Sequence, residues 1–153
     1  MPSRGRRHIF LSPGGLFCGD ASFVVKTVLG SCIAVCLWDG HLRHGGINHF
    51  VLPRWNGSGP PLHYGDTSID QMLAQLTGMG SRPAGLTAKL FGGAAVLGTG
   101  KAGETVGELN TAVARERLAA HRIPLAAQNV GGPFGRQIIF DLSSGEVKLR
   151  QLT

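Results

Sequence analysis

The segment Ser22 to Trp38, SFVVKTVLGSCIAVCLW, contains two apolar runs separated by a short polar turn. The first run, Ser22 to Leu29, is rich in β-branched residues and therefore predicts a β-strand. The second run, Ile33 to Trp38, is almost continuously apolar, which is typical of a buried strand. Gly30-Ser31 provides the turn between them. The segment thus predicts two consecutive strands, with Cys32 immediately before the second.

Hairpin signals extend this pattern along the chain. Asp39-Gly40 signals a turn, so Gly46 to Leu52 is expected to be the strand that returns beside Ile33 to Trp38. Ser143 to Gly145 signals a second hairpin. Further strands are expected at His8 to Leu11, Ala88 to Phe91, Leu125 to Val130, Gln137 to Leu142 and Glu146 to Leu152.

Two helices are expected as well. After Asp66 and Thr67, the expected N-caps, apolar residues keep the i, i+3, i+4, i+7 spacing of one helix face, and Gly78 or Gly80 should end this helix. The second helix is expected over about Gly107 to His121, before a proline. Because strands outnumber helices and hairpins outnumber βαβ units, the pattern predicts the α+β class.

The 153 residues, of which 42% are hydrophobic, suffice for one domain with a hydrophobic core. We expect a single domain over 1–153, with about 1–7 as a flexible basic N-terminus. No apolar stretch reaches the ~18 residues of a membrane-spanning helix, and no signal-peptide pattern is present. A cytoplasmic protein without membrane insertion is therefore expected. The net charge of +6 favours an acidic partner, but no nucleic-acid-binding pattern accompanies it.

The three cysteines, Cys18, Cys32 and Cys36, limit the possible chemistry. An odd number without an export signal argues against a disulfide framework. On one strand, Cys32 and Cys36 would lie about 13 Å apart, which is too far for a shared zinc ion or a disulfide. We expect no metal site and no cofactor, and we expect Cys36 to belong to the core.

Cys32 and His49 lie on the two arms of the first hairpin. With a four-residue connection they face each other, with Cβ atoms ~5 Å apart. A five-residue connection would instead put them on opposite faces of the sheet. The chemical interpretation is a thiol paired with a base. The alternative is a small buried Cys and a hydrogen-bonded His inside an apolar sheet.

The surroundings of Cys32 favour the chemical interpretation. Backbone N–H groups at Gly30 and Ser31 would lie near the sulfur, where an oxyanion would form during attack on a carbonyl. Because Cys32 lies beside a glycine turn and opposite His49, we expect it to be the only thiol with a strongly lowered pKa. Thr27, on the preceding strand, is a candidate for orienting the imidazole.

Two other motifs have simpler explanations. Gly98 to Gly103 matches the dinucleotide pattern G-x-G-x-x-G, but no acidic residue follows at the expected distance, so a flexible loop is a better interpretation than a nucleotide site. His41, His44 and His63 lie close to His49 in the sequence. No carboxylate is interleaved with them, so we interpret them as solvated turn residues rather than metal ligands.

Several segments together carry a resemblance to a known family. Val28 to Leu37 (VLGSCIAVCL) and Gly45 to Pro53 (GGINHFVLP) form a GSC…GGxxHxxLP pair. The likeness continues through Tyr64-Gly65-Asp66, Ala88 to Ala94, Val106-Gly107 with Asn110, and Gly131-Gly132 with Gly135-Arg136. In this order, over nearly the whole chain, these segments closely resemble the signature of the CheD chemoreceptor glutamine deamidases.

The resemblance implies an α+β sandwich of mostly antiparallel β-sheet with two main flanking helices, related to deamidating toxin cysteine hydrolases. It implies Cys32 as nucleophile and His49 as base. In some members the orienting Thr lies six residues before the Cys, where this chain has Lys26, and Thr27 lies one place closer.

The implied activity is deamidation of specific glutamine side chains on methyl-accepting chemotaxis receptors, through a Cys-His thioester mechanism. The implied partners are these receptors and a CheC-type phosphatase, and the chain is expected to be a monomer. The alternative hypothesis is a mainly non-catalytic regulatory binding module for a CheC-type phosphatase or a receptor.

Overall fold

The computed structural model of the chain describes residues 5–95 and 104–153, so Gly98 to Gly103 lies outside the described residues. The described strands are β1 (Arg7–Phe10), β2 (Leu16–Asp20), β3 (Phe23–Leu29), β4 (Ile33–Asp39), β5 (His44–Asn48), β6 (Leu86–Gly92), β7 (Leu125–Val130), β8 (Arg136–Asp141) and β9 (Val147–Gln151). The helices are α1 (Gly65–Gly78) and α2 (Val106–Ala120), with short 3₁₀ helices η1 (Pro61–His63) and η2 (Pro83–Gly85).

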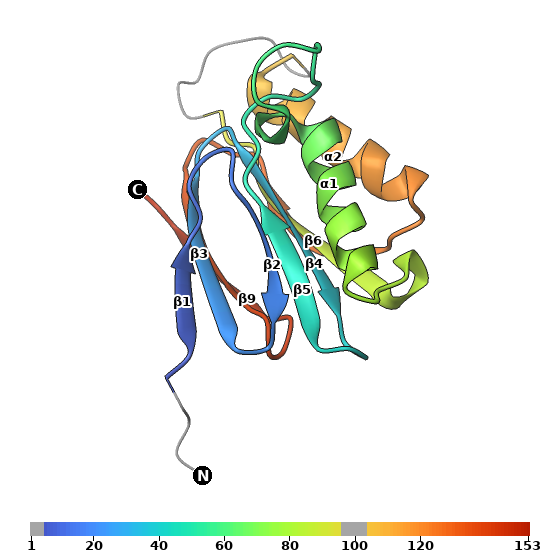
Figure 1. Cartoon of the computed structure of the whole chain (residues 1–153). Coiled ribbons are helices and arrows are strands. Elements are labelled where there is room, and N and C mark those ends of the chain that lie inside the picture. The colour runs from blue at the N-terminus through green and yellow to red at the C-terminus, as the bar shows by residue number, and fades with distance from the viewer. Residues whose placement is uncertain (1–4, 96–103) are drawn as a thin grey trace.

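These elements form three layers (Figure 1). A four-stranded sheet, β1-β3-β8-β9, packs against a five-stranded sheet, β2-β5-β4-β6-β7. Both α-helices cover the other face of the five-stranded sheet. Most strand pairs are antiparallel, while β1–β3 and β6–β7 are parallel. The expected α+β sandwich with two main helices is confirmed.

The central strand β4 explains the unbroken apolar run in the sequence. Ile33, Val35 and Leu37 pack into the core beneath the helices. Ala34 and Cys36, on the other face of the same strand, pack into the core between the two sheets. Because side chains alternate along a strand, a central strand covered on both faces must be apolar at every position. Cys36 is a core residue, as expected.

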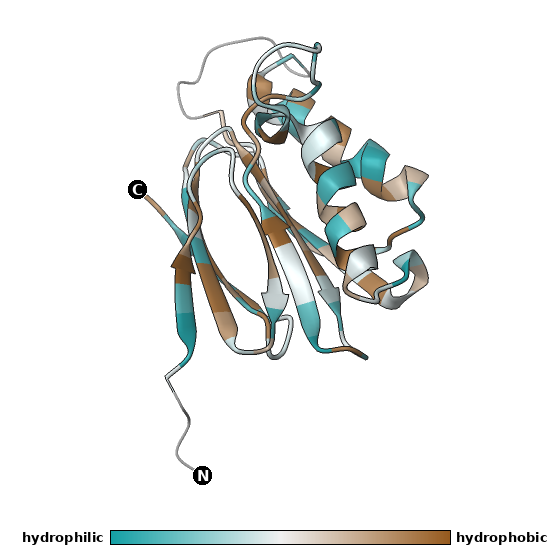
Figure 2. Ribbon diagram, viewed as in Figure 1, coloured by the Kyte–Doolittle hydropathy of each residue, from teal (hydrophilic) through white to brown (hydrophobic). Residues whose placement is uncertain are grey.

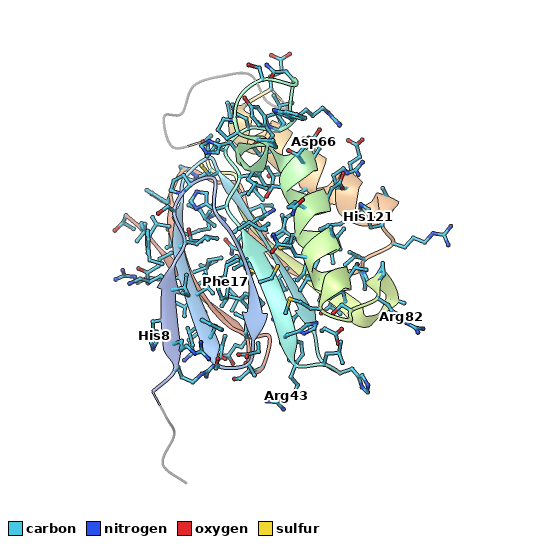
Figure 3. The ribbon with its side chains drawn as sticks, viewed as in Figure 1. His8, Phe17, Arg43, Asp66, Arg82 and His121 are labelled. Atoms are coloured by element: carbon cyan, nitrogen blue, oxygen red, sulfur yellow. The ribbon has the colours of Figure 1, made fainter. Side chains whose placement is uncertain are left out.

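The strand β2 was not expected from the sequence. It is short and contains Gly19 in place of an alternating apolar pattern, so periodicity gives little signal there. It lies at an edge of the five-stranded sheet and pairs antiparallel with β5. Phe17 lies on this strand (Figure 3). Its ring packs edge-on against Phe23 of the facing sheet, with ring centroids 4.8 Å apart.

Both helices carry mixed apolar and hydrophilic residues, as amphipathic surface helices do (Figure 2). Neither described helix is both long and apolar enough to cross a membrane. The end of α1 at Gly78 is as expected, but Asp66 and Thr67 do not cap it, because the helix already begins at Gly65. Instead, Asp66 Oδ1 accepts a hydrogen bond from the backbone N–H of Trp55 at 3.0 Å. These side chains therefore fasten the preceding loop to α1.

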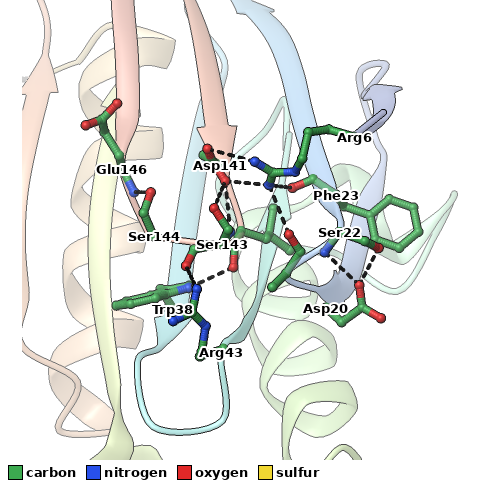
Figure 4. Close-up of polar contacts among 12 residues, drawn as sticks. Arg6, Asp20, Ser22, Phe23, Trp38, Arg43, Asp141, Ser143, Ser144 and Glu146 are labelled. Atoms are coloured by element: carbon green, nitrogen blue, oxygen red, sulfur yellow. Dashed lines mark hydrogen bonds and ion pairs between the residues drawn. The ribbon is translucent and has the colours of Figure 1, made fainter. Parts of the chain in front are cut away.

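The N-terminal segment is part of the fold from Arg6 onward, contrary to the expected flexibility of residues 1–7. The Arg6 guanidinium donates to both carboxylate oxygens of Asp141, at 2.6 and 3.2 Å, and to the carbonyls of Ala21 and Phe23 (Figure 4). This ion pair holds the pKa of the Asp141 carboxyl well below its usual range. Arg7 then begins β1, which pairs with β3. The basic residues were misinterpreted because their partners are distant in sequence.

His44 also differs from its interpretation as a solvated turn residue. It is the first residue of β5 and is buried. Its Nε2 lies 2.6 Å from Ser81 Oγ, and this hydroxyl donates to Asp39 Oδ2 at 2.6 Å. His41 is exposed in the turn, as expected. A buried polar chain therefore closes this end of the hairpin.

Candidate active site

Thr27 and His49 are in direct contact between the two sheets. Both side chains are buried, and Thr27 Oγ1 lies 2.7 Å from His49 Nδ1. The same hydroxyl oxygen lies 2.7 Å from the carbonyl of Leu11. A carbonyl can only accept and a hydroxyl has one proton, so Thr27 donates to Leu11 and accepts from the Nδ1–H of His49. This chain of bonds leaves the lone pair of His49 on Nε2.

His49 Nε2 is therefore the reactive atom of the ring. It is buried and has no hydrogen-bond partner among the described residues. Burial lowers the pKa of His49 to about 4, because the charged imidazolium is poorly solvated there. At neutral pH the ring is uncharged, with a basic nitrogen available for a proton.

The hairpin that carries Cys32 and His49 differs in register from the expectation. The connection has four residues, Gly40 to Arg43, but it begins one residue later than expected. Asp39 still belongs to β4 and pairs with His44. The prediction that Cys32 and His49 lie directly opposite each other is therefore wrong.

The observed register nevertheless keeps the two residues on one face. The last pairing of the hairpin is the bridge between Ile33 and Phe50. The same register puts His49 opposite Ala34, and Cys32 two positions from Ala34 on the same face. Consistently, Cys32 packs against the core between the sheets, where His49 also lies. Diagonal neighbours of this kind have Cα atoms ~7–8 Å apart, within reach of an imidazole and a thiol.

The turn before Cys32 is held by the end of β6. The carbonyl of Cys32 accepts from the N–H of Gly93, and the carbonyl of Gly30 accepts from the N–H of Ala94, both at 2.9 Å. Gly92 has φ +111°, and a Cβ there would lie 2.1 Å from the Cys32 carbonyl oxygen. Only glycine fits this approach.

This arrangement leaves two backbone donors beside the sulfur. Within residues 5–95 and 104–153, the N–H groups of Ser31 and Cys32 donate to no backbone or side-chain oxygen. The N–H of Cys32 does interact with its own thiol, and this contact acts to lower the pKa of Cys32. Free N–H groups next to a thiol are suited to bind an oxyanion, if one forms there.

The thiol itself is less acidic than the sequence suggested. Cys32 is half-buried, and burial raises its pKa more than the contact with its own N–H lowers it. The expected strong lowering of the pKa is therefore wrong. Burial raises the pKa of Cys18 to about 12, and raises that of the fully buried Cys36 well above the ordinary range. In the resting site, thiol and imidazole are both neutral.

Two further polar residues flank the site without having been assigned a role from the sequence. Asn48, next to His49 at the end of β5, points to the helix-covered face of the sheet, where its Oδ1 accepts from the N–H of Val35 at 2.7 Å and its Nδ2 donates to Ser68 of α1 at 3.0 Å. Asn110, on α2, donates to the carbonyls of Ser31 and Val51, at 3.1 Å each. Both residues lie in the segments that carry the resemblance, which was the only sequence signal for them.

Comparison with known proteins shows to which family the chain belongs. A family model described as CheD chemotactic sensory transduction matches residues 51–151. The "Probable chemoreceptor glutamine deamidase CheD" of Rhodospirillum rubrum is 46% identical over 143 residues, 94% of this chain and 81% of that protein. The protein of the same name from Trichlorobacter lovleyi is 42% identical over 144 residues, 94% of this chain and 89% of that protein. The chain belongs to the CheD family.

The family model and the alignments with the relatives cover different parts of the candidate site. The family model begins at Val51, two residues after His49, and includes Asn110. The alignments with the relatives span 94% of the chain and so extend over Cys32 and His49 as well. Among solved structures, the hypothetical protein YfiH of Bacillus licheniformis covers 83% of this chain and 60% of its own, at 15% identity and a TM-score of 0.48. We draw no conclusion from that similarity.

The site predicts an order of thiol reactivity in this CheD protein. Iodoacetamide should modify Cys32 before Cys18 and Cys36, because Cys32 is the least buried and has the smallest rise in pKa. Its reaction should accelerate above the ordinary thiol pKa of about 8.5 rather than below it. Peptide mass spectrometry at increasing pH measures the order, with denatured protein as the control in which all three react. Earlier labelling of Cys18 or Cys36 in folded protein would contradict it.

Proposed function

We propose that this CheD protein deamidates glutamine side chains of methyl-accepting chemotaxis receptors to glutamate, as a cysteine amidohydrolase with Cys32 as nucleophile. The observation that carries the proposal is the hydrogen bond from His49 Nδ1 to Thr27, which leaves the basic lone pair on Nε2 of a residue that shares one face of the sheet with Cys32. The printed names of the relatives, chemoreceptor glutamine deamidases, support the substrate class.

The first step is attack on the carboxamide. The sulfur of Cys32 forms a bond to the amide carbon while His49 Nε2 takes the thiol proton. The carbonyl π electrons move to oxygen, and the free N–H groups of Ser31 and Cys32 bind the resulting oxyanion. Since both groups are neutral at rest, proton transfer accompanies attack instead of preceding it.

The second step releases ammonia. The oxyanion collapses, the C–N bond breaks and the imidazolium of His49 gives its proton to the leaving nitrogen, which leaves a thioester on Cys32. An imidazolium with a pKa of about 4 is a strong proton donor, which suits this transfer. His49 then takes a proton from water, and the hydroxide adds to the thioester carbon. The C–S bond breaks, the departing thiolate takes the proton back from His49, and the new carboxylic acid loses its proton to the released ammonia. The products are glutamate and the regenerated thiol.

Deamidation of a receptor fragment tests the proposal. A purified cytoplasmic fragment of a chemoreceptor that carries glutamines is incubated with the protein, and its peptides are analysed by mass spectrometry. The expected result is the amide-to-acid mass gain at specific glutamines, with one negative charge added per site. A fragment that binds but keeps all its glutamines would instead support the regulatory binding module.

Three finer expectations accompany this proposal. The chain acts in the cytoplasm, where the modified part of a receptor lies, it is a monomer, and it binds a CheC-type phosphatase. Size-exclusion chromatography with light scattering tests the monomer, and titration with a purified CheC-type protein tests the partner.

Thr27 is expected to be an orienting residue in this mechanism. Replacing Thr27 by Val keeps the shape but removes the oxygen that accepts from His49 Nδ1, so the ring loses its fixed tautomer. We expect kcat to fall by about 10–100-fold, by analogy with the loss seen when the partner that orients a metal-binding histidine is removed. Thr27→Ser keeps the hydroxyl and should retain most activity. Equal activity of the Val variant and the parent would remove Thr27 from the mechanism.

A further inference from the structure

The strands that carry Cys32 and His49 separate just beyond their last pairing. Ile33 and Phe50 exchange two backbone hydrogen bonds, at 3.0 and 3.1 Å. In an antiparallel pair of strands only every second pair of residues exchanges hydrogen bonds, so the next bonded pair beyond this bridge would be Ser31 and Leu52. Among the described residues these two exchange no backbone hydrogen bond, because the N–H of Leu52 donates to the carbonyl of His63 and the carbonyl of Leu52 accepts from Gly65. The hydrogen bonds of the sheet therefore fix the spacing of the two strands as far as Ile33, and not at the residue before Cys32.

One side chain spans this gap. Asn110 is fully buried, and its Nδ2 donates to the carbonyl of Ser31 and to the carbonyl of Val51, at 3.1 Å each. Both partners can only accept, so the nitrogen of the amide must face them, and each of its two hydrogens is used. A single planar group thus holds the residue before Cys32 and the second residue after His49.

The helix that carries Asn110 is itself placed tightly. A Cβ on Gly107 of α2 would lie 2.2 Å from the carbonyl oxygen of Gly93, at the end of β6. The absence of side chains lets the helix backbone approach the strand that also holds the Cys32 carbonyl. Asn110 therefore reaches the gap from a rigid position.

The amide oxygen of Asn110 makes an unfavourable contribution to the stability of the fold. Its Oδ1 is buried and has no hydrogen-bond partner in the described part of the chain. A buried acceptor without a partner destabilises a fold, because it has lost its hydrogen bonds to water and gained none in the protein. An unpaired atom of this kind calls for an explanation, and the two bonds made by Nδ2 supply one.

We propose that Asn110 is a positioning residue that sets the distance between the thiol of Cys32 and Nε2 of His49, and that holds the N–H groups of Ser31 and Cys32 in place for the oxyanion. Its role in catalysis rests on the proposed function. Its effect on the geometry of Cys32 does not rest on the proposed function, because this effect can be measured without any substrate.

The experiment compares three variants with the parent. Asn110→Ala removes both donors. Asn110→Asp keeps the shape but turns an acceptor toward two carbonyls, until protonation of the buried carboxylate restores one donor at low pH. Thr111→Val is the matched control, because it removes a buried hydrogen bond to Gly107 within the same helix, and among the described residues the Thr111 side chain makes no hydrogen bond to the strands of Cys32 and His49. Thermal unfolding is recorded for each variant.

Two readouts separate positioning from general stability. For Asn110→Ala we expect kcat on a receptor fragment to fall roughly 10²-fold with little change in KM, since a displacement of about 1 Å has that effect. Its iodoacetamide profile at Cys32 should move to higher pH, because the N–H that lowers the pKa of this thiol is no longer held beside it. For Asn110→Asp, the labelling rate relative to the parent should recover as pH falls.

The outcomes are distinguishable. Parent-like labelling and kcat in Asn110→Ala would overturn the positioning role. Changes of equal size in Thr111→Val would do the same, because they would show a general effect of a loosened helix. If the parent itself deamidates nothing, the proposed function fails, while the labelling profiles still decide the role of Asn110.

Discussion

Replacing Cys32 by Ala is expected to abolish deamidation of a chemoreceptor fragment completely. In the proposed mechanism the change removes the group that forms the thioester, and neither remaining thiol is placed to replace it, since Cys36 is buried and Cys18 packs beneath the helices on the other face of the sheet, where burial raises its pKa to about 12. The side chain is small and half-buried, so binding of the fragment should persist. Mass spectrometry of receptor peptides measures the loss, and a pull-down with the same fragment measures binding.

Cys18→Ala is the matched control for this variant. Cys18 lies on β2 and packs toward Met72, in the core beneath the helices. Its replacement should leave deamidation at the parent level. If Cys32→Ala still converts glutamine to glutamate, the thioester mechanism is wrong, and loss of activity only in Cys18→Ala would transfer the role to that thiol.

Replacing His49 by Asn should reduce kcat by roughly 10²–10⁴-fold, the usual contribution of general acid–base assistance. The Asn side chain cannot take the proton from Cys32 or deliver one to ammonia. His41→Asn, at an exposed turn position, is the control and should act like the parent. Single-turnover kinetics distinguish slow thioester formation from slow hydrolysis. Parent-like rates in His49→Asn would show that water or another group supplies the base.

The low pKa of His49 also fixes the sign of the pH dependence. The proposed mechanism needs the neutral imidazole, so kcat/KM should decline only as pH falls toward about 4, and not near the ordinary value of about 6.5. In the unfolded chain the same ring gains its proton near the ordinary value, so the unfolded state binds more protons between these two limits. The free energy of unfolding should therefore decrease as pH falls through this window, and His49→Asn should flatten that dependence.

Much of the fold could be predicted because local pattern and burial agree. The apolar run of β4, and the glycines that separate the strands around it, can be recognised from neighbouring residues alone. The predicted strands and helices therefore lie where expected within a few positions. The edge strand β2 could not be found, because two glycines flank or interrupt it and its pairing with β5 is a tertiary contact. For the same reason the partner of Arg6 could not be predicted, since Asp141 lies 135 positions away in the sequence.

The sequence predicts that the candidate residues lie near one another, which the structure bears out for Thr27 and His49, but it does not predict their register. Cys32 and His49 were chosen by chemistry and spacing, yet the direct opposition was wrong because Asp39 extends β4 by one residue and moves the pairing by two. Asn110 carried no signal of its own, since its two acceptors are backbone carbonyls that a sequence does not display. The pKa of Cys32 was misjudged for a related reason: burial comes from packing and is not a property of neighbouring residues.

The order of strands in the four-stranded sheet has a consequence for the chain during its synthesis. Thr27 lies on β3, between β1, which is translated early, and β8, which is translated late. Until β8 has left the ribosome, one side of β3 has no partner, and Arg6 has no carboxylate to bind at Asp141. Contacts so distant in sequence form slowly, because a long loop must close first. We therefore expect a nascent chain that has not reached the C-terminal strands to hold His49 without a fixed orientation, so that hydrolytic competence arises late in translation.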